Sequence, residues 1–447
     1  MRANVNDALQ ESERILGLIK QNNLTPEDRD QIVQDSLENF TQYVTKAIMV
    51  NRKSYSEDFT IAEWEDEGAI FRDTHGREYI DCLGGYGVYL LGHRHPKVVE
   101  AVSAQLHRYA LHSQELIDPL RGYLSKLVAM ITPGDLQHTY LVNAGTEANE
   151  MALKLARLAT GKKWFISTEK GFHGKTFGSL SATGKGVYRT PYLPLVPGFQ
   201  HVPYGDAAAV EEAIRQLTLV GETVAGVIVE PIQGEGGVNI PPDDYLPKLR
   251  EICDRYECLL IVDEIQTGMG RTGKLFGVDH VDVTPDIMTL GKAFGGGVMP
   301  IAAMVTKHKY WSRMEENPFI LGSSTFGGNP LAASASIAAI HTILQEDVPG
   351  IVYEKGNYFM AILQKIQSRY ADVLVDVRGR GLLIGLEFKT NESGYAVAKT
   401  IFGEQILVGG TLNNATVIRI EPPYLISYEQ IDRVLATLER ALAQLTG

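Results

Sequence analysis

Two residues of this chain, an aspartate and a lysine, have surroundings that suit chemistry. Asp263 ends the apolar run CLLIVD, so its carboxyl group is expected at the carboxyl end of a buried strand. A carboxylate in such a poorly solvated place needs a cationic partner to remain ionised. Lys292 lies in MTLGKAFGGG, where small neighbours leave room for a planar ligand against the backbone. Taken singly, Asp263 is more simply a strand-end acid that caps a loop or binds a metal, and Lys292 an exposed loop lysine.

Three further segments offer contacts for a phosphorylated ring. In NAGTEANE, Gly145 and Thr146 open a strongly helical stretch, and a helix N-terminus attracts phosphate. The loop GSSTFGGNP offers Thr325 to a second phosphate oxygen, and GFHGKTFG places Phe172 where its ring can stack on a ligand. The plainer alternatives are an ordinary helix capped by Thr146, a simple connection and a core phenylalanine.

These pieces jointly match one cofactor, pyridoxal 5′-phosphate (PLP). PLP needs a phosphate anchor, a stacking ring, an acid for its pyridine nitrogen and a lysine for its aldehyde. Asp263 and Lys292 supply the last two, so the sequence predicts a PLP enzyme in which Lys292 joins the cofactor as a Schiff base. No set of metal ligands is predicted.

A rival motif is weaker. Gly268, Gly270 and Gly273 in GMGRTG fit a dinucleotide-binding pattern that follows a strand. However, the next segment, KLFGVDHVDVTPD, is a poor helix start, and Leu275 stands where a phosphate loop requires Ser or Thr. A nucleotide site is therefore not expected here.

The composition is that of a soluble globular protein and limits the partners. The 447 residues carry a net charge of −12 at pH 7 with no visible basic face, which argues against nucleic acid. No apolar run approaches membrane-spanning length, and the first residues lack the apolar part of a secretion signal. Cys82, Cys253 and Cys258 cannot all pair with one another, which fits a reducing compartment. We therefore expect a cytoplasmic protein.

Strand and helix patterns alternate through the middle of the chain. Short apolar, β-branched runs at 163–168, 225–232 and 258–265 are separated by segments of helical periodicity such as 243–257. This alternation predicts an α/β fold with a mostly parallel sheet covered on both faces.

The ends of the chain have other patterns. Residues 1–50 favour two polar amphipathic helices, and the segment around His75–Gly76 favours a hairpin. The expected domains are a helical N-terminal extension whose strands pack with the small domain (1–85), a large PLP-binding domain (86–330) and a smaller α+β domain (331–447).

The motifs and their order resemble the class III aminotransferases, the family of the ornithine and 4-aminobutyrate enzymes. The segments that carry the resemblance, in family order and at family-like spacing, are NAGTEANE, FHGKT, EPIQGEGG, DEIQTGMGRTG, LGKAFGGG and STFGGNP. Any one of them is weak evidence, but the set is highly specific. The resemblance implies the PLP-dependent transferase fold of type I, with a large domain built on a mostly parallel sheet and a smaller α+β domain.

The resemblance also implies roles for individual residues. Lys292 would hold the cofactor and then move the proton, Asp263 would pair with the pyridine nitrogen, and Gln266 would hydrogen-bond the ring 3-hydroxyl group. The other expected cofactor contacts are Gly145, Thr146, Phe172, His173, Glu230 and Thr325, the last reaching across the interface of a homodimer or higher oligomer with shared active sites.

On the substrate side, Arg419 in VIRIEPP matches the arginine that grips the α-carboxylate of 2-oxoglutarate or glutamate. Glu235 matches the acid that pairs with this arginine when no α-carboxylate is present. A buried arginine without a partner is costly, so a switch between Glu235 and substrate avoids that cost. Tyr86 and Gln114 are expected in the wall that faces the amine.

Within the class, the segments CLGGYGVYLLGHRHP, LHSQELIDPLR, LPLVPGFQHVPYG and VGGTLNNATVIRIEPP resemble members that act on diamines. This likeness implies transfer of the terminal amino group of putrescine, or of cadaverine, to 2-oxoglutarate by a ping-pong mechanism. The products from putrescine would be glutamate and 4-aminobutanal, which closes to 1-pyrroline. The alternatives are an ornithine or other ω-amino acid aminotransferase and, more distantly, a PLP-dependent aminomutase, which would need no 2-oxoglutarate, or a non-catalytic PLP-binding protein.

Overall fold

The computed structural model describes residues 5–21, 23–47, 61–113 and 115–446, which form two compact units. The first unit holds the described residues up to Asp66 together with Phe71–Tyr79. The second holds Glu67–Ile70 and everything from Ile80 onward. None of the helices in the described ranges combines the length and apolar character that a membrane crossing requires.

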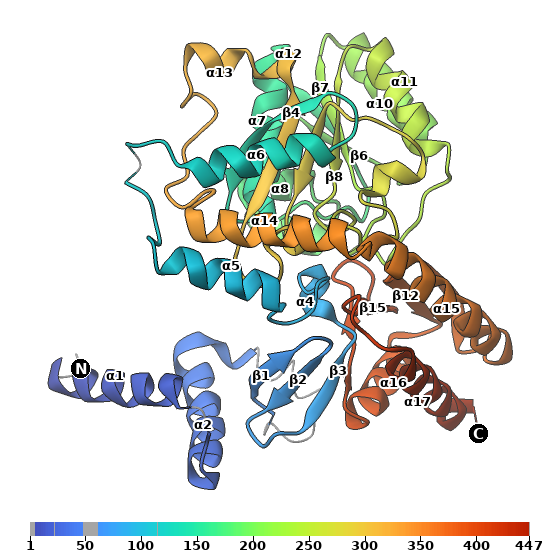
Figure 1. The fold of residues 1–447 in the computed structure, drawn as a ribbon. Helices are drawn as coiled ribbons and strands as arrows, with labels where there is room; N and C mark the ends of the chain where they lie inside the picture. The colour runs from blue at the N-terminus through green and yellow to red at the C-terminus, as the bar shows by residue number, and fades with distance from the viewer. Residues whose placement is uncertain (1–4, 22, 48–60, 114, 447) are drawn as a thin grey trace. The chain divides into compact units, whose positions relative to one another are not determined.

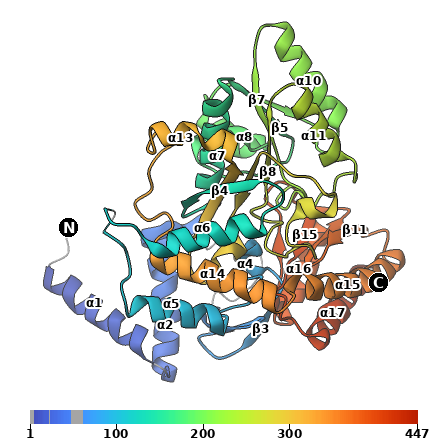
Figure 2. The same ribbon diagram turned by 45° about the horizontal axis from the view of Figure 1, so that its top comes forward.

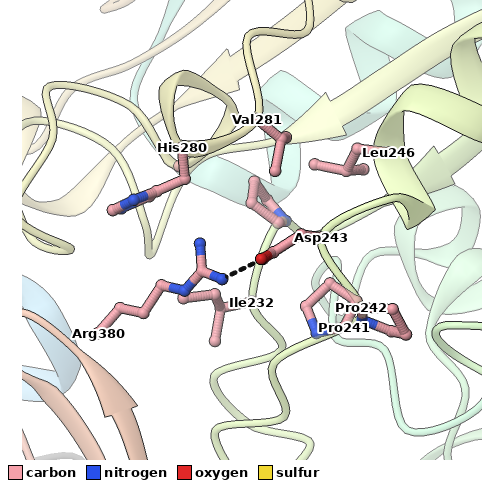
Figure 3. Close-up of a pocket in the computed structure, with 10 residues that line it drawn as sticks. Ile232, Pro241, Pro242, Asp243, Leu246, His280, Val281 and Arg380 are labelled. Atoms are coloured by element: carbon pink, nitrogen blue, oxygen red, sulfur yellow. Dashed lines mark hydrogen bonds and ion pairs between the residues drawn. The ribbon is translucent and has the colours of Figure 1, made fainter.

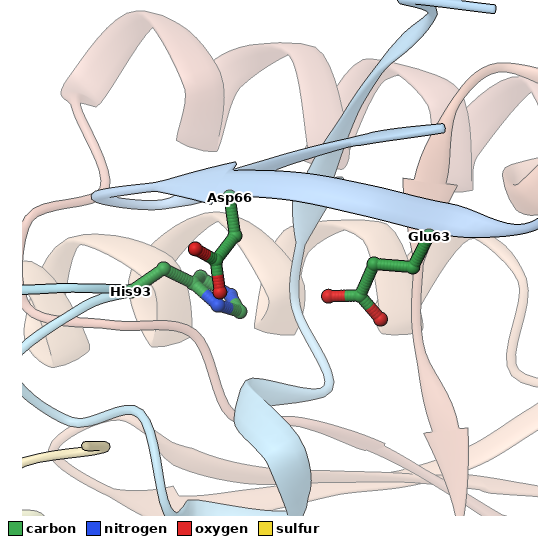
Figure 4. Close-up of side chains that lie close together, drawn as sticks. All are labelled: Glu63, Asp66 and His93. Atoms are coloured by element: carbon green, nitrogen blue, oxygen red, sulfur yellow. The ribbon is translucent and has the colours of Figure 1, made fainter. Parts of the chain in front are cut away.

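The first unit begins with the two helices that the sequence predicts. Thr25 and Asp28 form a capping box at the start of the second helix, in which each side chain bonds the other residue's backbone N–H. Arg14 on the first helix pairs with Asp35 on the second at 2.8 Å. The elements of this unit are α1 (Val5–Lys20), α2 (Pro26–Asn39), the π-helix η1 (Phe40–Thr45), β1 (Glu63–Glu67), from which Glu63 and Asp66 project (Figure 4), and β2 (Ile70–Asp73).

The predicted turn around His75–Gly76 is present. It follows β2 and precedes β3 (Glu78–Asp81), and the Asp73 N–H donates to the Arg77 carbonyl oxygen at 3.2 Å. Gly76 has a φ of +78°, which glycine adopts without the cost that a Cβ would bring.

The second unit is built on a seven-stranded sheet. Its strands, in spatial order, are β4 (Leu136–Val142), β10 (Ala302–Lys307), β9 (Ile287–Leu290), β8 (Leu259–Asp263), β7 (Val224–Val229), β5 (Trp164–Thr168) and β6 (Phe199–Val202). Strand β10 is antiparallel to both of its neighbours, whereas β9, β8, β7, β5 and β6 are parallel. The prediction of a mostly parallel sheet is confirmed.

Helices cover both faces of this sheet; Figure 1 shows α6 and α14 in front of the strands and α7 behind them, and Figure 2 gives the turned view. Strands β7 and β8 are buried at every residue, which explains their continuous apolar runs. The helical elements are α4 (Gly84–Gly87), α5 (Pro96–Leu106), α6 (Pro119–Ile131), α7 (Gly145–Thr160), α8 (Phe177–Ala182), α9 (Gly186–Arg189), η2 (Thr190–Tyr192), α10 (Ala207–Leu219), α11 (Tyr245–Arg255), η3 (Gly277–His280), η4 (Lys292–Gly295), α12 (His308–Trp311), α13 (Arg313–Glu316) and α14 (Pro330–Gln345).

The C-terminal part carries a second, antiparallel sheet of order β11-β12-β15-β14. Its elements are α15 (Val348–Arg369), β11 (Leu374–Arg380), β12 (Leu383–Phe388), α16 (Asn391–Gly403), β13 (Ile406–Leu407), β14 (Gly409–Gly410), β15 (Val417–Ile420) and α17 (Tyr428–Thr446). Strand β13 pairs in parallel with the end of β3, where Ile406 faces Ile80. The domain limits at residues 85 and 330 stay a prediction.

An ion pair links the two sheets of the second unit. Arg380 on β11 extends to Asp243, in the loop before α11, with 2.5 Å between Nη2 and Oδ1. Figure 3 shows this pair at the edge of a pocket whose lining includes Ile232 and Pro242. The small antiparallel sheet is thereby tied to the loops that leave the large sheet.

Candidate active site

Asp263 lies at the carboxyl end of β8 and is 4% exposed. Its carboxylate is held on both oxygens. Oδ2 accepts from Asn149 Nδ2 and lies next to His173 Nδ1, each at 2.8 Å. Oδ1 accepts from the Ile265 N–H at 3.1 Å and from Thr289 Oγ1 at 3.3 Å. The acid that the sequence singles out is therefore buried, oriented and surrounded by hydrogen-bond donors.

His173, which follows the expected stacking residue, lies beside this acid. Burial lowers the pKa of its imidazole, but the hydrogen bond to Asp263 and the negative charge of Glu230 outweigh burial, and the net pKa is raised. A raised pKa favours imidazolium, the form that pairs with a carboxylate. The structure thus places a histidine where the sequence requires a cationic partner for this carboxylate.

Lys292 lies next to the same strand ends. Asp263 on β8 pairs in register with Thr289 on β9, and Lys292 follows Thr289 by one short turn of chain. Burial lowers the pKa of the Lys292 amine, although Glu421, Glu235 and Asp263 act in the opposite direction. A lowered pKa increases the fraction of neutral amine, the form that attacks carbonyl carbon and accepts protons.

The backbone at Lys292 is strained. Its φ is +47°, in the left-handed region that residues with a Cβ rarely occupy. Strain of this kind persists where the surrounding structure determines it and is frequent at functional sites. The preceding residue, Gly291, sits against Ile265, because a Cβ there would lie 3.3 Å from the isoleucine Cγ2.

The expected phosphate anchor is the start of α7. The helix begins at Gly145, as predicted, but its N-cap is Ala144, so Thr146 lies inside the first turn and is not the cap. The Thr146 hydroxyl instead bonds Thr176 Oγ1 at 2.9 Å and Ser179 Oγ at 2.7 Å. A Cβ at Gly145 would lie 2.6 Å from Ile265 Cδ1, so this N-terminus packs directly beside the segment that follows Asp263.

Glu230 and Phe172 form a further part of the site. Glu230 follows β7, is buried, and accepts from the Phe172 N–H at 3.0 Å. Burial raises the pKa of Glu230 to about 7, and the nearby Asp263 also raises it, whereas His173 and Lys292 lower it. The hydrogen bond from the Phe172 N–H to Glu230 holds the segment that carries Phe172 in place. The Phe172 side chain is half-buried.

Arg419 and Glu235, the two substrate residues expected from the sequence, are in contact. Arg419 projects from β15 with no exposed surface, and its Nη2 donates to Glu235 Oε1 at 2.9 Å. Glu235 is also buried, and its Oε2 accepts from the Leu412 N–H at 2.8 Å. The Arg419 guanidinium carbon lies 5.3 Å from the centre of the Tyr86 ring. The expected arginine–glutamate pair is thus formed.

Sequence reasoning missed two residues of this site. Asn149, one turn into α7, donates to both Asp263 and the His173 carbonyl oxygen. Its place in the motif NAGTEANE, on the helix face next to the expected phosphate anchor, was the available signal. Glu421, two residues after Arg419, is fully buried and accepts from Gln266 Nε2. A charged residue after a buried strand is the same signal that identified Asp263.

Of the remaining expected residues, Tyr86 and Thr325 are exposed. Tyr86 has a φ of +57° in α4 and is 46% exposed. Thr325 lies in an exposed loop before α14. Gln114 lies outside the described residues.

The residues at the strand ends fit PLP. Among the described residues, the buried polar atoms at the site that have no hydrogen-bond partner include Gln266 Oε1 and Arg419 Nη1, besides His173 Nε2, Arg419 Nε and Glu421 Oε2. Buried polar atoms usually have partners, so such atoms indicate a missing ligand. An acceptor for a ring hydroxyl group and a donor for a carboxylate are the groups that a PLP site and its keto-acid substrate require.

A mostly parallel sheet with a lysine and an acid at neighbouring strand ends defines the class of the protein, a PLP-dependent transferase. Residues 52–442 match the family model described as "Aminotransferase class-III". The chain belongs to the class III aminotransferases.

Similar proteins agree with this membership. The chain is 47% identical over 442 residues to a putrescine aminotransferase of Pectobacterium atrosepticum, covering 98% of this chain and 94% of that protein. Among solved structures, the ornithine aminotransferase of Toxoplasma gondii superimposes with a TM-score of 0.84 at 30% identity, covering 95% of this chain and 99% of the other. A transaminase of the marine bacterium Virgibacillus gives a TM-score of 0.85 at 26% identity, covering 92% and 100%.

Proposed function

We propose that this enzyme transfers the terminal amino group of a diamine, with putrescine as the preferred substrate, to 2-oxoglutarate. The observation that carries the proposal is the buried pair of Arg419 and Glu235, at 2.9 Å. A site that accepts a cationic amine in one half-reaction and a dicarboxylate in the other needs an arginine that can change partner. The 47% identity to a putrescine aminotransferase supports the choice of amine.

We assign the cofactor contacts as follows. Lys292 binds the cofactor aldehyde, Asp263 pairs with the pyridine nitrogen, and Gln266 contacts the ring 3-hydroxyl group. The N-terminal turn of α7 with Gly145 and Thr146 binds the phosphate, since its free N–H groups and helix dipole attract an anion. Phe172 covers one face of the ring. Glu230 holds the Phe172 backbone, and His173 holds Asp263.

When bound, PLP supplies an aldehyde carbon that exchanges amines and a ring that takes up electrons as the substrate Cα–H bond weakens. Asp263, held by Asn149 and His173, would be the residue that holds a proton on the pyridine nitrogen. With the cofactor bound, the Lys292 amine would be the group that takes the proton from the substrate Cα and returns it, acting as a positioned acid and base. Its lowered pKa leaves more of the amine neutral and ready to accept that proton.

The two substrates then use the same pocket in turn, which gives ping-pong kinetics. With the amine, Glu235 stays on Arg419 and neutralises it. With 2-oxoglutarate, the α-carboxylate replaces Glu235 on the guanidinium group. The released aldehyde from putrescine is 4-aminobutanal, which closes to 1-pyrroline.

We further propose a homodimer with shared active sites, in which Thr325 of one chain binds the phosphate in the other. The position of Thr325 in an exposed loop, next to Phe326 with 55% of its surface exposed, supports a contact surface there. We place the enzyme in the cytoplasm and its reaction in the breakdown of polyamines.

The test is a panel of amines, with 2-oxoglutarate as acceptor and glutamate formation as the measurement. Putrescine should have the highest kcat/KM, followed by cadaverine, while ornithine and ω-amino acids should be poorer substrates. Parallel lines in double-reciprocal plots against both substrates would support the ping-pong order. Product formation that continues without 2-oxoglutarate would instead indicate an aminomutase, and a preference for ornithine would overturn the choice of amine.

A further inference from the structure

A second carboxylate, Glu421, accompanies Arg419. Its Oε2 lies 3.3 Å from Arg419 Nε, whereas Glu235 Oε1 accepts from Arg419 Nη2, so the two carboxylates meet different nitrogens of the guanidinium group. Its Oε1 accepts from Gln266 Nε2 and lies 3.6 Å from Arg271 Nε. Both arginines and Glu421 are at most 1% exposed. One buried acid thus serves two buried arginines and the glutamine expected beside the cofactor.

The four charges balance only as a set. Arg271 and Arg419 contribute two positive charges, and Glu235 and Glu421 two negative ones. Arg271 donates to the carbonyl oxygens of Leu382 and Pro422, at 3.2 and 2.6 Å, but Glu421 is its only carboxylate within 4 Å among the described residues. Because a buried guanidinium group without an anion is strongly unfavourable, Glu421 must stay beside Arg419 when Glu235 leaves it.

The backbone at Glu421 is fixed. Its N–H donates to the Cys82 carbonyl oxygen at 2.7 Å, and two prolines, Pro422 and Pro423, follow it with restricted φ. The carbonyl oxygen of Glu421 packs directly against Gly84, because a Cβ at Gly84 would lie 2.1 Å from it. Glu421 therefore cannot follow a change at the substrate side of Arg419.

Glu235 has a different setting. It lies in the loop that follows β7, between Gly234 and Gly236, and Gly237 has a φ of +117°. A glycine-rich backbone tolerates rearrangement at low cost. The Leu412 N–H, at 2.8 Å from Glu235 Oε2, offers the acid a second partner when it leaves the arginine. Of the two carboxylates on Arg419, Glu235 is therefore the one able to move.

We propose that Glu421 is the permanent counter-ion of Arg419, which keeps the guanidinium group in place while Glu235 yields to the carboxylate of the keto acid. This rests on the proposed function of Arg419 and adds a positioning residue to it. Glu421 repels a substrate carboxylate no more than it repels Glu235 in the same position, so charge repulsion does not decide the exchange between them. The exchange depends instead on whether Glu421 keeps Arg419 in place.

The two carboxylates should then have opposite effects. Replacement of Glu421 by Gln removes the anchor, and the loss appears when Glu235 is displaced, that is, with the dicarboxylate. Calorimetric titration of the purified holoenzyme with glutarate, a dicarboxylate that carries no reactive carbonyl group, should show affinity reduced roughly tenfold or more in E421Q. Single-turnover reaction with putrescine, in which Glu235 still holds Arg419, should change by less than roughly threefold.

Two further variants separate the explanations. E212Q changes an exposed glutamate on α10 that pairs with Arg215 outside the site, and it should leave glutarate affinity within roughly threefold of wild type. E421D keeps the charge with a shorter side chain, so it should fold where E421Q does not, and it should weaken glutarate binding in the same direction. Unchanged or tighter glutarate binding in the Glu421 variants, or a larger loss with putrescine than with glutarate, would overturn the proposal.

The glutarate titration needs no turnover, so it separates this proposal from the proposed function. If no amine yields glutamate with the wild-type enzyme but Glu421 variants still lose glutarate affinity, the assigned reaction is wrong and the anchor remains. If the wild-type enzyme transaminates putrescine but does not bind glutarate, the anchor is wrong and the reaction remains.

Discussion

Asn149 donates a hydrogen bond to Asp263 Oδ2 at 2.8 Å, and the same amide nitrogen donates to the His173 carbonyl oxygen at 2.7 Å. Its amide oxygen accepts from Thr289 Oγ1 at 2.9 Å. One side chain from α7 therefore connects the strand-end acid, the histidine beside it and strand β9. Asp263 is oriented by the helix that also carries the expected phosphate anchor.

Removal of this connection should reduce catalysis with little effect on folding. In N149A, Asp263 loses one of its donors, and a lost hydrogen bond to a charged group corresponds to roughly 10- to 100-fold in rate. We expect kcat to fall by that factor, with a shifted pH dependence of the absorbance of the bound cofactor. T289V removes the longer contact of 3.3 Å to Asp263 and the bond to the Asn149 amide oxygen, but it leaves the Asn149 amide nitrogen on Asp263, so it should have a smaller effect. Equal losses in both variants would contradict this ranking.

Lys292 should be indispensable for both cofactor attachment and turnover. K292A removes the amine that binds the aldehyde and the group that moves the proton, so the absorbance of the attached cofactor and the activity should disappear together, the activity by about a thousandfold or more. The exposed Lys274 in the same stretch of chain is the matched control, and K274A should behave as wild type. Full activity in K292A would end the case for a PLP enzyme.

Replacement of Glu235, the acid proposed to leave Arg419, should affect the two half-reactions unequally. In E235Q, Arg419 loses a charged partner that it needs only when no substrate carboxylate is present. Single-turnover spectroscopy should therefore show a larger loss with putrescine than with 2-oxoglutarate, roughly tenfold apart. Equal losses in the two half-reactions would refute the exchange of partners.

The start of α7 should tolerate no side chain. In G145A, the new Cβ would lie 2.6 Å from Ile265 Cδ1, so either the isoleucine or the helix N-terminus must shift. We expect the Kd for PLP to rise roughly tenfold, measured by equilibrium titration of cofactor-free protein. Gly122, in α6, has no atom within 4 Å of an added Cβ, so G122A is the control and should leave the Kd unchanged.

His201 on β6 should make the protein sensitive to acid. Burial and the adjacent Arg189 lower the pKa of His201 to about 4. Below the ordinary histidine pKa of about 6.5, the unfolded chain binds a proton that the folded chain refuses, so stability falls as the pH drops from about 6.5 to about 4. Urea unfolding at about pH 7.5 and about pH 5 should show a loss near 2 kcal/mol that is absent in H201Q. The exposed His107 is the control, and a loss that persists in H201Q would contradict the assignment.

Much of the fold was predictable because buried parallel strands have continuous apolar runs that are recognisable in the sequence. The runs at 163–168, 225–232 and 258–265 became β5, β7 and β8 within a few residues of the expected limits, since these strands are largely buried and most of their positions are apolar. The helix expected over 243–257 is α11, Tyr245–Arg255. Asp263 and Lys292 were identifiable for a related reason. Burial of a charged group next to an apolar run is unfavourable unless the group has a partner or a function.

The contacts that orient these groups depend on residues distant in the chain. Asn149 and Asp263 are 114 positions apart, and Glu421 lies 155 positions from Gln266. No local pattern indicates which of many polar side chains will meet, because the choice depends on how helices and strands pack. The sequence alone therefore established the class of chemistry, from short motifs whose residue types PLP demands. Packing selected the partners, because a hydrogen bond or ion pair depends on distances that only the assembled sheets set.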